Sequence, residues 1–334
     1  MTTNCSNRNH GLDTLRGIGI LLVVMLHCGF SGAAMHGAML FAIPLFYVVA
    51  GCLFADSSSL ARLAVDKFRR LIVPFIFYAL LGLGVYVAGN CLLLHQPFKA
   101  SLFNIFSTDR YYLPYPAALW FFLSIFWCYM FYGMIRRVAH DDRAVAALCL
   151  ATGIAGWVLS RCLPLPLSLD TAMSWLPAFC IGNMLKRYPA GQIILKGRYW
   201  PAGVLAAGLC CTIFVVAQYN AGYCYNLFTG NIPAIIALSV CATLGMLDFW
   251  CHLGNVPVLS RLGRNSLVIF AGHQLFTIIM EQGMKHLHIN TPHIITAILL
   301  TVVSIAGSIA IANIVRAFAP SLIGEQKKRP LPKF

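Results

Sequence analysis

Apolar stretches long enough to cross a membrane recur along the whole chain, separated by polar or Pro/Gly-rich breaks. Of the 334 residues, 59% are hydrophobic and only 10% are charged, and the mean hydropathy is +0.77. A soluble domain carries about 25% charged residues, and a transmembrane helix needs about 20 consecutive apolar residues. The sequence therefore predicts an all-α fold, a polytopic transmembrane helical bundle.

About ten spans can be placed, and an even number puts both chain termini on the same side of the membrane. We expect a cytoplasmic N-terminal segment over 1–11, a transmembrane domain over 12–318 and a basic cytoplasmic tail over 319–334. The predicted spans are 12–30, 37–55, 71–94, 117–135, 144–161, 170–186, 200–218, 230–250, 265–283 and 294–316.

The basic residues are unevenly divided between the two sides. Nineteen of the 24 Lys and Arg residues fall in the two terminal segments and the alternate loops that share their side. By the positive-inside rule both termini are cytoplasmic. Topology and anionic lipid headgroups explain the net charge of +14, so membrane lipids are expected partners and nucleic acid is not. A cleaved signal peptide is disfavoured, because its loss would invert this balance.

The 13 cysteines are scattered, mostly within the apolar spans, and none shows Cys-x-x-Cys spacing. This pattern indicates neither a zinc site nor a disulfide framework. Buried cysteine behaves as a small hydrophobic residue. We therefore expect no metal.

Two ionisable side chains, Arg16 and His27, interrupt the first predicted span. Eleven residues make roughly three helical turns, so both project from nearly the same face, about 16 Å apart along the axis. Intramembrane ionisable groups are costly and usually face a polar interior or a ligand. This helix is therefore predicted to line a site. Asp13 can form an ion pair with Arg16, or its negative charge can stabilise the first helical turn by interacting with the helix dipole.

Three cations, Lys67, Arg69 and Arg70, occur within four residues in the loop predicted before the third span. These cations fit the ordinary pattern in which Lys and Arg flank a membrane span on its cytoplasmic side. They equally suit a clamp for a phosphorylated cytosolic ligand, because Arg matches phosphate oxygens with a planar fork and Lys adds a point charge. The segment alone does not separate the two interpretations.

Several short segments occur together in a characteristic order. They are Arg16 with His27, Pro44-Leu45-Phe46 with Gly51, Lys67-Phe68-Arg69-Arg70 before Leu71-Ile72-Val73-Pro74, Leu119-Trp120-Phe121, and Leu262-Gly263-Arg264-Asn265-Ser266-Leu267 with His273. The ordered set resembles the integral-membrane acyltransferase-3 family. Leu169-Asp170-Thr171-Ala172 followed by Phe179, Gly182 and Leu185 is similar to the fucose 4-O-acetylase-like branch. One departure is Ala50, where relatives commonly have Ser, and another is the lack of a following SGNH-type hydrolase domain.

The resemblance implies an O-acetyltransferase of the bacterial inner membrane. The donor would be acetyl-CoA, and the acceptor a hydroxyl of a cell-surface or lipid-linked glycan such as lipopolysaccharide O-antigen, capsule or exopolysaccharide. His27 is the candidate base, since a neutral imidazole is available at cytosolic pH; an acyl-imidazole at the same residue is a rival role. Arg16 would meet phosphate or polarise the thioester carbonyl, and Lys67, Arg69 and Arg70 would hold the coenzyme phosphates.

For the acceptor, the candidate residues are Asp170, Glu281 and Trp120. Trp120 also suits an interfacial aromatic belt, and His273 suits a satisfied interhelical histidine better than a second base. Entry of a glycan from the periplasm and of a lipid-linked sugar from the cytoplasmic leaflet both remain open. The oligomeric state is not specified by the sequence.

Two other functional classes compete with an enzyme. A secondary transporter or channel for a small polar solute also uses intramembrane Arg, His and Glu, but paired broken helices in two matching halves are not found. A membrane sensor or scaffold would not need the Arg16 and His27 spacing. Acetyl transfer from labelled acetyl-CoA distinguishes the three classes.

Overall fold

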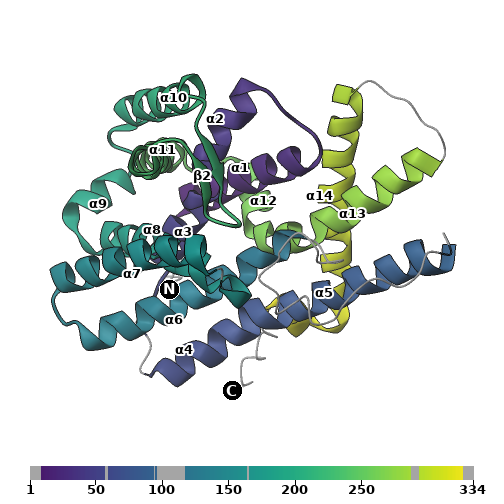
Figure 1. Cartoon of the computed structure of the whole chain (residues 1–334), viewed down its shortest axis with the longest axis horizontal. Helices are drawn as coiled ribbons and strands as arrows, with labels where there is room; N and C mark the ends of the chain where they lie inside the picture. The colour runs from purple at the N-terminus through teal and green to yellow at the C-terminus, as the bar shows by residue number, and fades with distance from the viewer. Residues whose placement is uncertain are drawn as a thin grey trace, which may run out of the picture.

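Helices make up nearly all of the computed structural model, which describes residues 9–56, 59–93, 95, 117–163, 165–286 and 293–325 (Figure 1). The longer helices are α1 (His10–His27), α2 (Ala33–Ala42), α3 (Pro44–Cys52), α4 (Leu60–Lys67), α5 (Val73–Tyr86), α6 (Trp120–Val138), α7 (Asp142–Cys162), α8 (Leu169–Arg187), α9 (Pro189–Ile194), α10 (Trp200–Val216), α11 (Ile232–Leu253), α12 (Pro257–Arg264), α13 (Ser266–His286) and α14 (His293–Phe318). Short helical turns are η1 (Phe68–Ile72), η2 (Val87–Leu93), η4 (Ala117–Leu119), η5 (Pro166–Ser168) and η6 (Pro320–Ile323). An antiparallel hairpin joins β1 (Asn220–Gly222) to β2 (Leu227–Thr229).

The predicted all-α class is confirmed, and each of the ten predicted spans overlaps a helix or a pair of helices. Among the described residues, six helical segments are long and apolar enough to cross a membrane, and α10 is a shorter apolar helix. The protein is thus a multi-pass membrane protein. The count of ten crossings stays a prediction. Residues 1–8 and 326–334, most of the predicted terminal segments, lie outside the described residues.

The first helix, α1, lies at the centre of the fold, between α12 and α13 on one side and α2 and α11 on the other (Figure 1). Asn9 begins the helix, since its side chain accepts a hydrogen bond from the Leu12 amide at 3.3 Å. A Cβ added at Gly17 would overlap the Leu259 carbonyl of α12, and one at Gly263 would overlap the Asp13 carbonyl. Small residues at both positions therefore let the two backbones touch.

The second predicted span, 37–55, is two helices rather than one. The chain breaks at Ile43 because Pro44 at the start of α3 has no amide hydrogen to continue the helix. Farther along α3, a Cβ at Gly51 would overlap the Phe179 carbonyl, and a Cβ at Gly182 of α8 would overlap the Val48 carbonyl. The two helices therefore approach as closely as α1 and α12 do.

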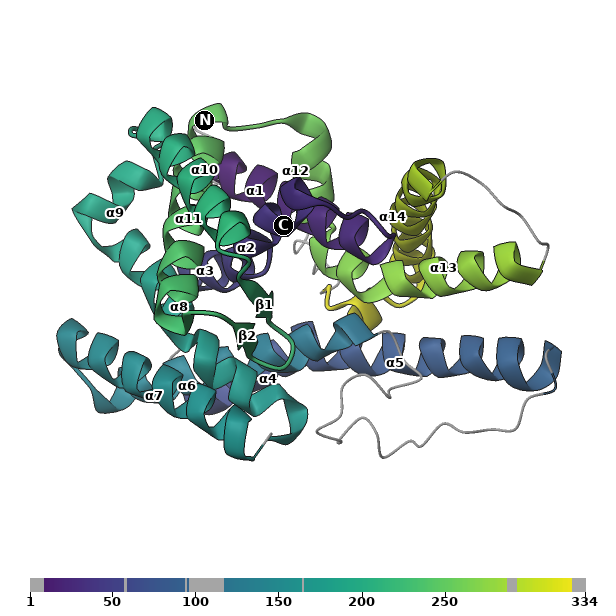
Figure 2. The same ribbon diagram turned by 45° about the horizontal axis from the view of Figure 1, so that its top comes forward.

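The helix containing the third predicted span begins much earlier than expected, at Leu60 instead of 71. Ser59 caps it by accepting a hydrogen bond from the Arg62 amide at 3.1 Å. From there α4, the π-helical turn η1 and α5 form one continuous rod, which rises from the bottom of Figure 1 toward its right edge and lies low in Figure 2. The cations at 67–70 are therefore helical, and η1 turns them relative to a regular α-helix. The prediction of a loop before the span was wrong.

One carboxylate joins the ends of three helices on the side rich in basic residues. Asp142 accepts hydrogen bonds from Arg136 at 2.6 Å, from Arg187 at 2.7 Å and from the Tyr188 hydroxyl at 2.6 Å. The bond to Asp142 raises the pKa of Tyr188, because loss of its proton would place two negative charges together. The cluster fixes α6, α7 and α8 relative to one another.

Candidate functional site

Arg16 and His27 lie toward opposite ends of α1, and both contact α13. The Arg16 guanidinium donates to the Ser266 hydroxyl at 2.8 Å and lies 3.9 Å from the Asp13 carboxylate. The imidazole of His27 lies 3.2 Å from the Gln274 side-chain amide and 5.2 Å from the ring of His273, centroid to centroid. Both side chains contact α13, as expected for residues that share a face of α1. Of the two roles open for Asp13, the structure shows both, since it lies in the first turn of α1 and near Arg16.

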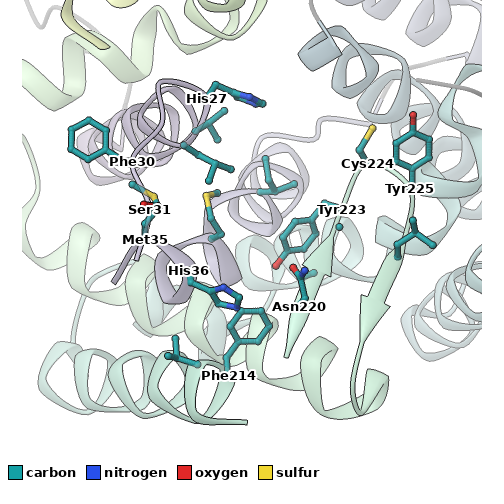
Figure 3. A pocket seen from close by; sticks show the side chains of 18 of the residues that line it. His27, Phe30, Ser31, Met35, His36, Phe214, Asn220, Tyr223, Cys224 and Tyr225 are labelled. Carbon is teal, nitrogen blue, oxygen red and sulfur yellow. The ribbon is translucent and has the colours of Figure 1, made fainter. Parts of the chain in front are cut away.

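His27 occupies the last turn of α1 and is exposed on the wall of a cavity of about 750 Å³ (Figure 3). The predicted span placed it three residues before the end, whereas the helix ends at His27 itself. The cavity, called here the His27 cavity, is walled by α1, α2, the start of α6, the end of α10 and the β1–β2 hairpin.

The opposite wall of the His27 cavity carries polar and aromatic side chains. His36 donates from Nε2 to the Tyr219 carbonyl at 2.7 Å and lies 4.9 Å from the ring of Phe214, centroid to centroid. Tyr223 donates from its hydroxyl to the Leu40 carbonyl at 2.9 Å, which fixes the hairpin against α2. Asn220 and Tyr225 line the same space (Figure 3). Amide and aromatic groups of this kind suit a polar ligand with apolar faces.

A second group of side chains surrounds Tyr129 of α6. The Lys67 ammonium lies 4.0 Å from the centre of the Tyr129 ring and 3.7 Å from the Asp66 carboxylate. Arg70 lies 3.6 Å from the same carboxylate, and both Arg16 and Arg70 are close enough to the Tyr129 hydroxyl to interact with it electrostatically. The structure thus brings Arg16 together with two of the three cations that the sequence grouped with it.

Arg69 and Arg70 also line a cavity of about 530 Å³ between η1 and the end of α14. Ser321 and Gly324 of the turn after α14 form the other wall, together with Glu325, which pairs with Arg316 at 2.6 Å. We call this space the Arg69–Arg70 cavity. Two exposed guanidinium groups facing one space can bind a phosphorylated ligand.

The three predicted acceptor residues are not gathered at one place. Trp120 lines the His27 cavity. Asp170, in contrast, is 1% exposed in the first turn of α8, and Glu281 is exposed on α13; neither lines the His27 cavity as the described residues define it. Asp170 and Glu281 are therefore poorly placed for a ligand beside His27, and their role stays a prediction.

Sequence reasoning missed two residues, namely Gln274, which contacts His27, and His36 on the opposite wall of the His27 cavity. Gln274 holds the only hydrogen bond to the His27 ring that the described residues provide. The sequence feature that could have indicated Gln274 was its polar side-chain amide, which adjoins His273 in an otherwise apolar segment. His36 carries no comparable signal, because only the packing of α2 against α10 brings it to the cavity.

No group of three or more His, Cys, Asp or Glu side chains within the described part of the chain is arranged to hold a metal ion. The titratable groups on the His27 cavity are imidazoles, a thiol and phenols. The arrangement can therefore move a proton at His27 and can bind anions at the Arg69–Arg70 cavity.

Apolar helices around a cavity with one exposed histidine, and a match of residues 9–313 to a family model described as an acyltransferase domain, define a membrane acyltransferase. The chain belongs to the acyltransferase-3 family, which confirms the resemblance seen in its motifs. A transporter is not favoured. Neither a comparison with curated proteins nor one with solved structures gives a match.

Proposed function

We propose that the protein moves an acetyl group from cytosolic acetyl-CoA to a hydroxyl of a cell-surface or lipid-linked glycan. The observation that carries the proposal is the position of His27. It is the histidine at the end of a central helix, exposed to a cavity with Trp120 and tyrosines, while Arg16 and further cations gather toward the other end of the same helix. Aromatic rings cover the apolar faces of sugars, and amides bind their hydroxyls.

The chemistry needs a base at the acceptor hydroxyl. His27 removes the proton as the hydroxyl oxygen attacks the thioester carbonyl carbon, and the carbon–sulfur bond then breaks. The coenzyme leaves as a thiolate and takes the proton from His27, so the products are an acetyl ester and free coenzyme A. In the rival route the His27 ring nitrogen attacks first and carries the acetyl group.

The donor would bind where the cations gather. Lys67, Arg69 and Arg70 would hold its phosphates at the Arg69–Arg70 cavity and beside Tyr129, and Arg16 would meet phosphate or the thioester carbonyl. Arg16 and His27 are eleven positions apart on α1, or about 16 Å along the axis. The extended pantetheine arm of the coenzyme would cover this distance toward His27.

We further propose ten crossings of the bacterial inner membrane, both termini in the cytoplasm, and periplasmic entry of the acceptor. The bias of basic residues supports this orientation. Cys224 lines the His27 cavity and is therefore expected to react with a membrane-impermeant maleimide in spheroplasts. Cysteines introduced at His140, Ala190 and Val258 would react only after permeabilisation. Labelling of the introduced cysteines in intact spheroplasts would overturn the orientation.

The direct test uses the purified protein, radiolabelled acetyl-CoA and glycan extracted from a deletion strain of the source organism. We expect label in the glycan with the parent protein and a loss of about 10²-fold or more with His27→Ala. His252→Ala is the matched control, because His252, near the end of α11, stacks on Trp200 and lines neither cavity. Transfer by the His27→Ala protein at the parental rate contradicts the assignment of His27.

A further inference from the structure

The side chain of Gln274 assigns the tautomer of His27. The Ala118 amide donates to Gln274 Oε1 at 2.8 Å, and a backbone amide can only donate, so the oxygen of the side chain faces η4, the turn before α6. The amide nitrogen, 3.2 Å from His27 Nδ1, can also only donate. His27 Nδ1 must therefore accept, and the neutral ring carries its proton on Nε2.

His273, the residue before Gln274 on α13, has the opposite tautomer to His27. Its Nδ1 lies 3.1 Å from the Ile269 carbonyl and 2.9 Å from the Phe270 carbonyl, and carbonyls only accept, so Nδ1 carries the proton. Nε2 is then a bare lone pair. The side chain is fully buried, and Nε2 has no hydrogen-bond partner among the described residues. Buried polar atoms are nearly always paired, so such an exception calls for an explanation.

The rings of His27 and His273 are 5.2 Å apart, centroid to centroid, at an angle of 43°. A nitrogen-to-nitrogen hydrogen bond of about 3 Å between two rings of about 1 Å radius gives a centroid distance of about 5 Å. The observed spacing of the two rings is therefore short enough for a hydrogen bond from the Nε2 hydrogen of His27 to the unpaired Nε2 of His273. The two tautomers are complementary, since one ring offers the proton and the other the lone pair.

We infer that His273 is a positioning residue for His27, an inference that rests on the proposed function. Gln274 covers His27 Nδ1 until the acceptor hydroxyl replaces its amide there. As the hydroxyl oxygen attacks the thioester, its proton moves to Nδ1, and the Nε2 hydrogen of the resulting imidazolium donates to His273. When the carbon–sulfur bond breaks, the Nδ1 proton passes to the coenzyme sulfur, and both rings regain their first state.

Two substitutions of His273 separate this role from a structural one. In His273→Asn the amide nitrogen replaces Nδ1 and keeps the bonds to the Ile269 and Phe270 carbonyls, but nothing replaces Nε2. In His273→Gln the side chain is longer, and its oxygen takes the place of the Nε2 lone pair. We expect His273→Asn to lower kcat about 10²-fold with both KM values unchanged, and His273→Gln to recover about tenfold of that loss.

Turnover is measured with radiolabelled acetyl-CoA and the deletion-strain glycan, and folding by size-exclusion profile in detergent. His273→Asn acting at the parental kcat, or His273→Gln acting no better than His273→Asn, overturns the inference. If His27→Ala is inactive in the same assay while His273→Asn is fully active, the proposed function stands and only the inference fails.

A second measurement needs no substrate and no substituted His273. Nitrogen-15 spectra of the parent protein with labelled histidine report the tautomer of His27, whose signals are identified by their loss in His27→Ala. We expect the Nε2-protonated form, and a mixture of forms in Gln274→Met, which removes the amide that holds Nδ1. A parent protein with His27 protonated at Nδ1 overturns the inference, even where the parent shows no acetyl transfer and the proposed function fails.

Discussion

Arg16 and His27, toward the two ends of α1, lie in opposite surroundings. Toward the first end, Arg16 is half-buried, hydrogen-bonded to Ser266 and close to Asp13, where α12 approaches at Gly17 and Gly263. At the other end the helix stops at His27, which is exposed to a cavity of about 750 Å³. Close backbone packing therefore holds the Arg16 guanidinium in place, whereas the end of the helix leaves the His27 imidazole exposed to the cavity.

Under the proposed function, a single helix would serve two substrates of different chemistry. A group that binds a fixed anionic donor gains from immobility, because fewer conformations are lost on binding. A base must instead be reachable by the hydroxyl that it deprotonates. If this division is correct, substitutions toward each end change the KM of one substrate and leave that of the other unchanged.

The largest effect is expected where α1 meets α12. Gly263→Val would push a side chain into the Asp13 carbonyl, and backbone atoms cannot move aside as a flexible side chain can. We expect a loss of about 1–3 kcal/mol in stability, measured as the thermal midpoint in detergent and the yield of monodisperse protein. Gly208→Val is the matched control, since a Cβ at Gly208 meets nothing within 4 Å among the described residues. Equal stability of the two variants would show that this contact is not tight.

A smaller effect is expected from Arg16→Lys. One ammonium cannot bond Ser266 and approach Asp13 as the forked guanidinium does. A hydrogen bond to a charged group contributes about 1.5–3 kcal/mol, so we expect the KM for acetyl-CoA to rise about tenfold, in steady-state assays at saturating glycan. The KM for the glycan serves as the internal control. A rise in the glycan KM alone would reverse the proposed roles of the two ends.

Arg69→Ala and Arg70→Ala are expected to raise the Kd for acetyl-CoA several-fold each. Both side chains are exposed, and solvent weakens their interaction with phosphate relative to a buried pair. Arg69→Lys and Arg70→Lys are expected to restore little if the contacts are bidentate. Equilibrium titration of acetyl-CoA measures the change. Curves that overlay the parent would make these residues determinants of topology only.

The smallest effect is expected from Trp120→Leu, which keeps an apolar side chain on the His27 cavity but removes the flat ring. We expect the KM for the glycan to rise about threefold with that for acetyl-CoA unchanged. Trp200→Leu is the control, because Trp200 stacks on His252 and lines neither cavity. A change in the acetyl-CoA KM instead would place the donor, and not the glycan, beside Trp120.

Much of this arrangement could be predicted from the sequence. Apolar length predicted where the helices are, and the period of 3.6 residues placed Arg16 and His27 on one face, as expected for two residues that both contact α13. The ordered motifs indicated the family, and the match over residues 9–313 confirms it. Local chemistry is sufficient for these inferences, because each depends on residues that are near one another in the chain.

Only the tertiary structure decided which faces meet. Ser266 and Gln274 reach α1 from about 250 residues away, Asp170 is buried apart from His27, and the cations expected in a loop form part of a helical rod. Lipid is as apolar as the helices, so burial of apolar surface does not select partners within a membrane. Small residues and interhelical hydrogen bonds select them instead, and their partners are specified by three-dimensional packing and not by the periodicity of any one helix.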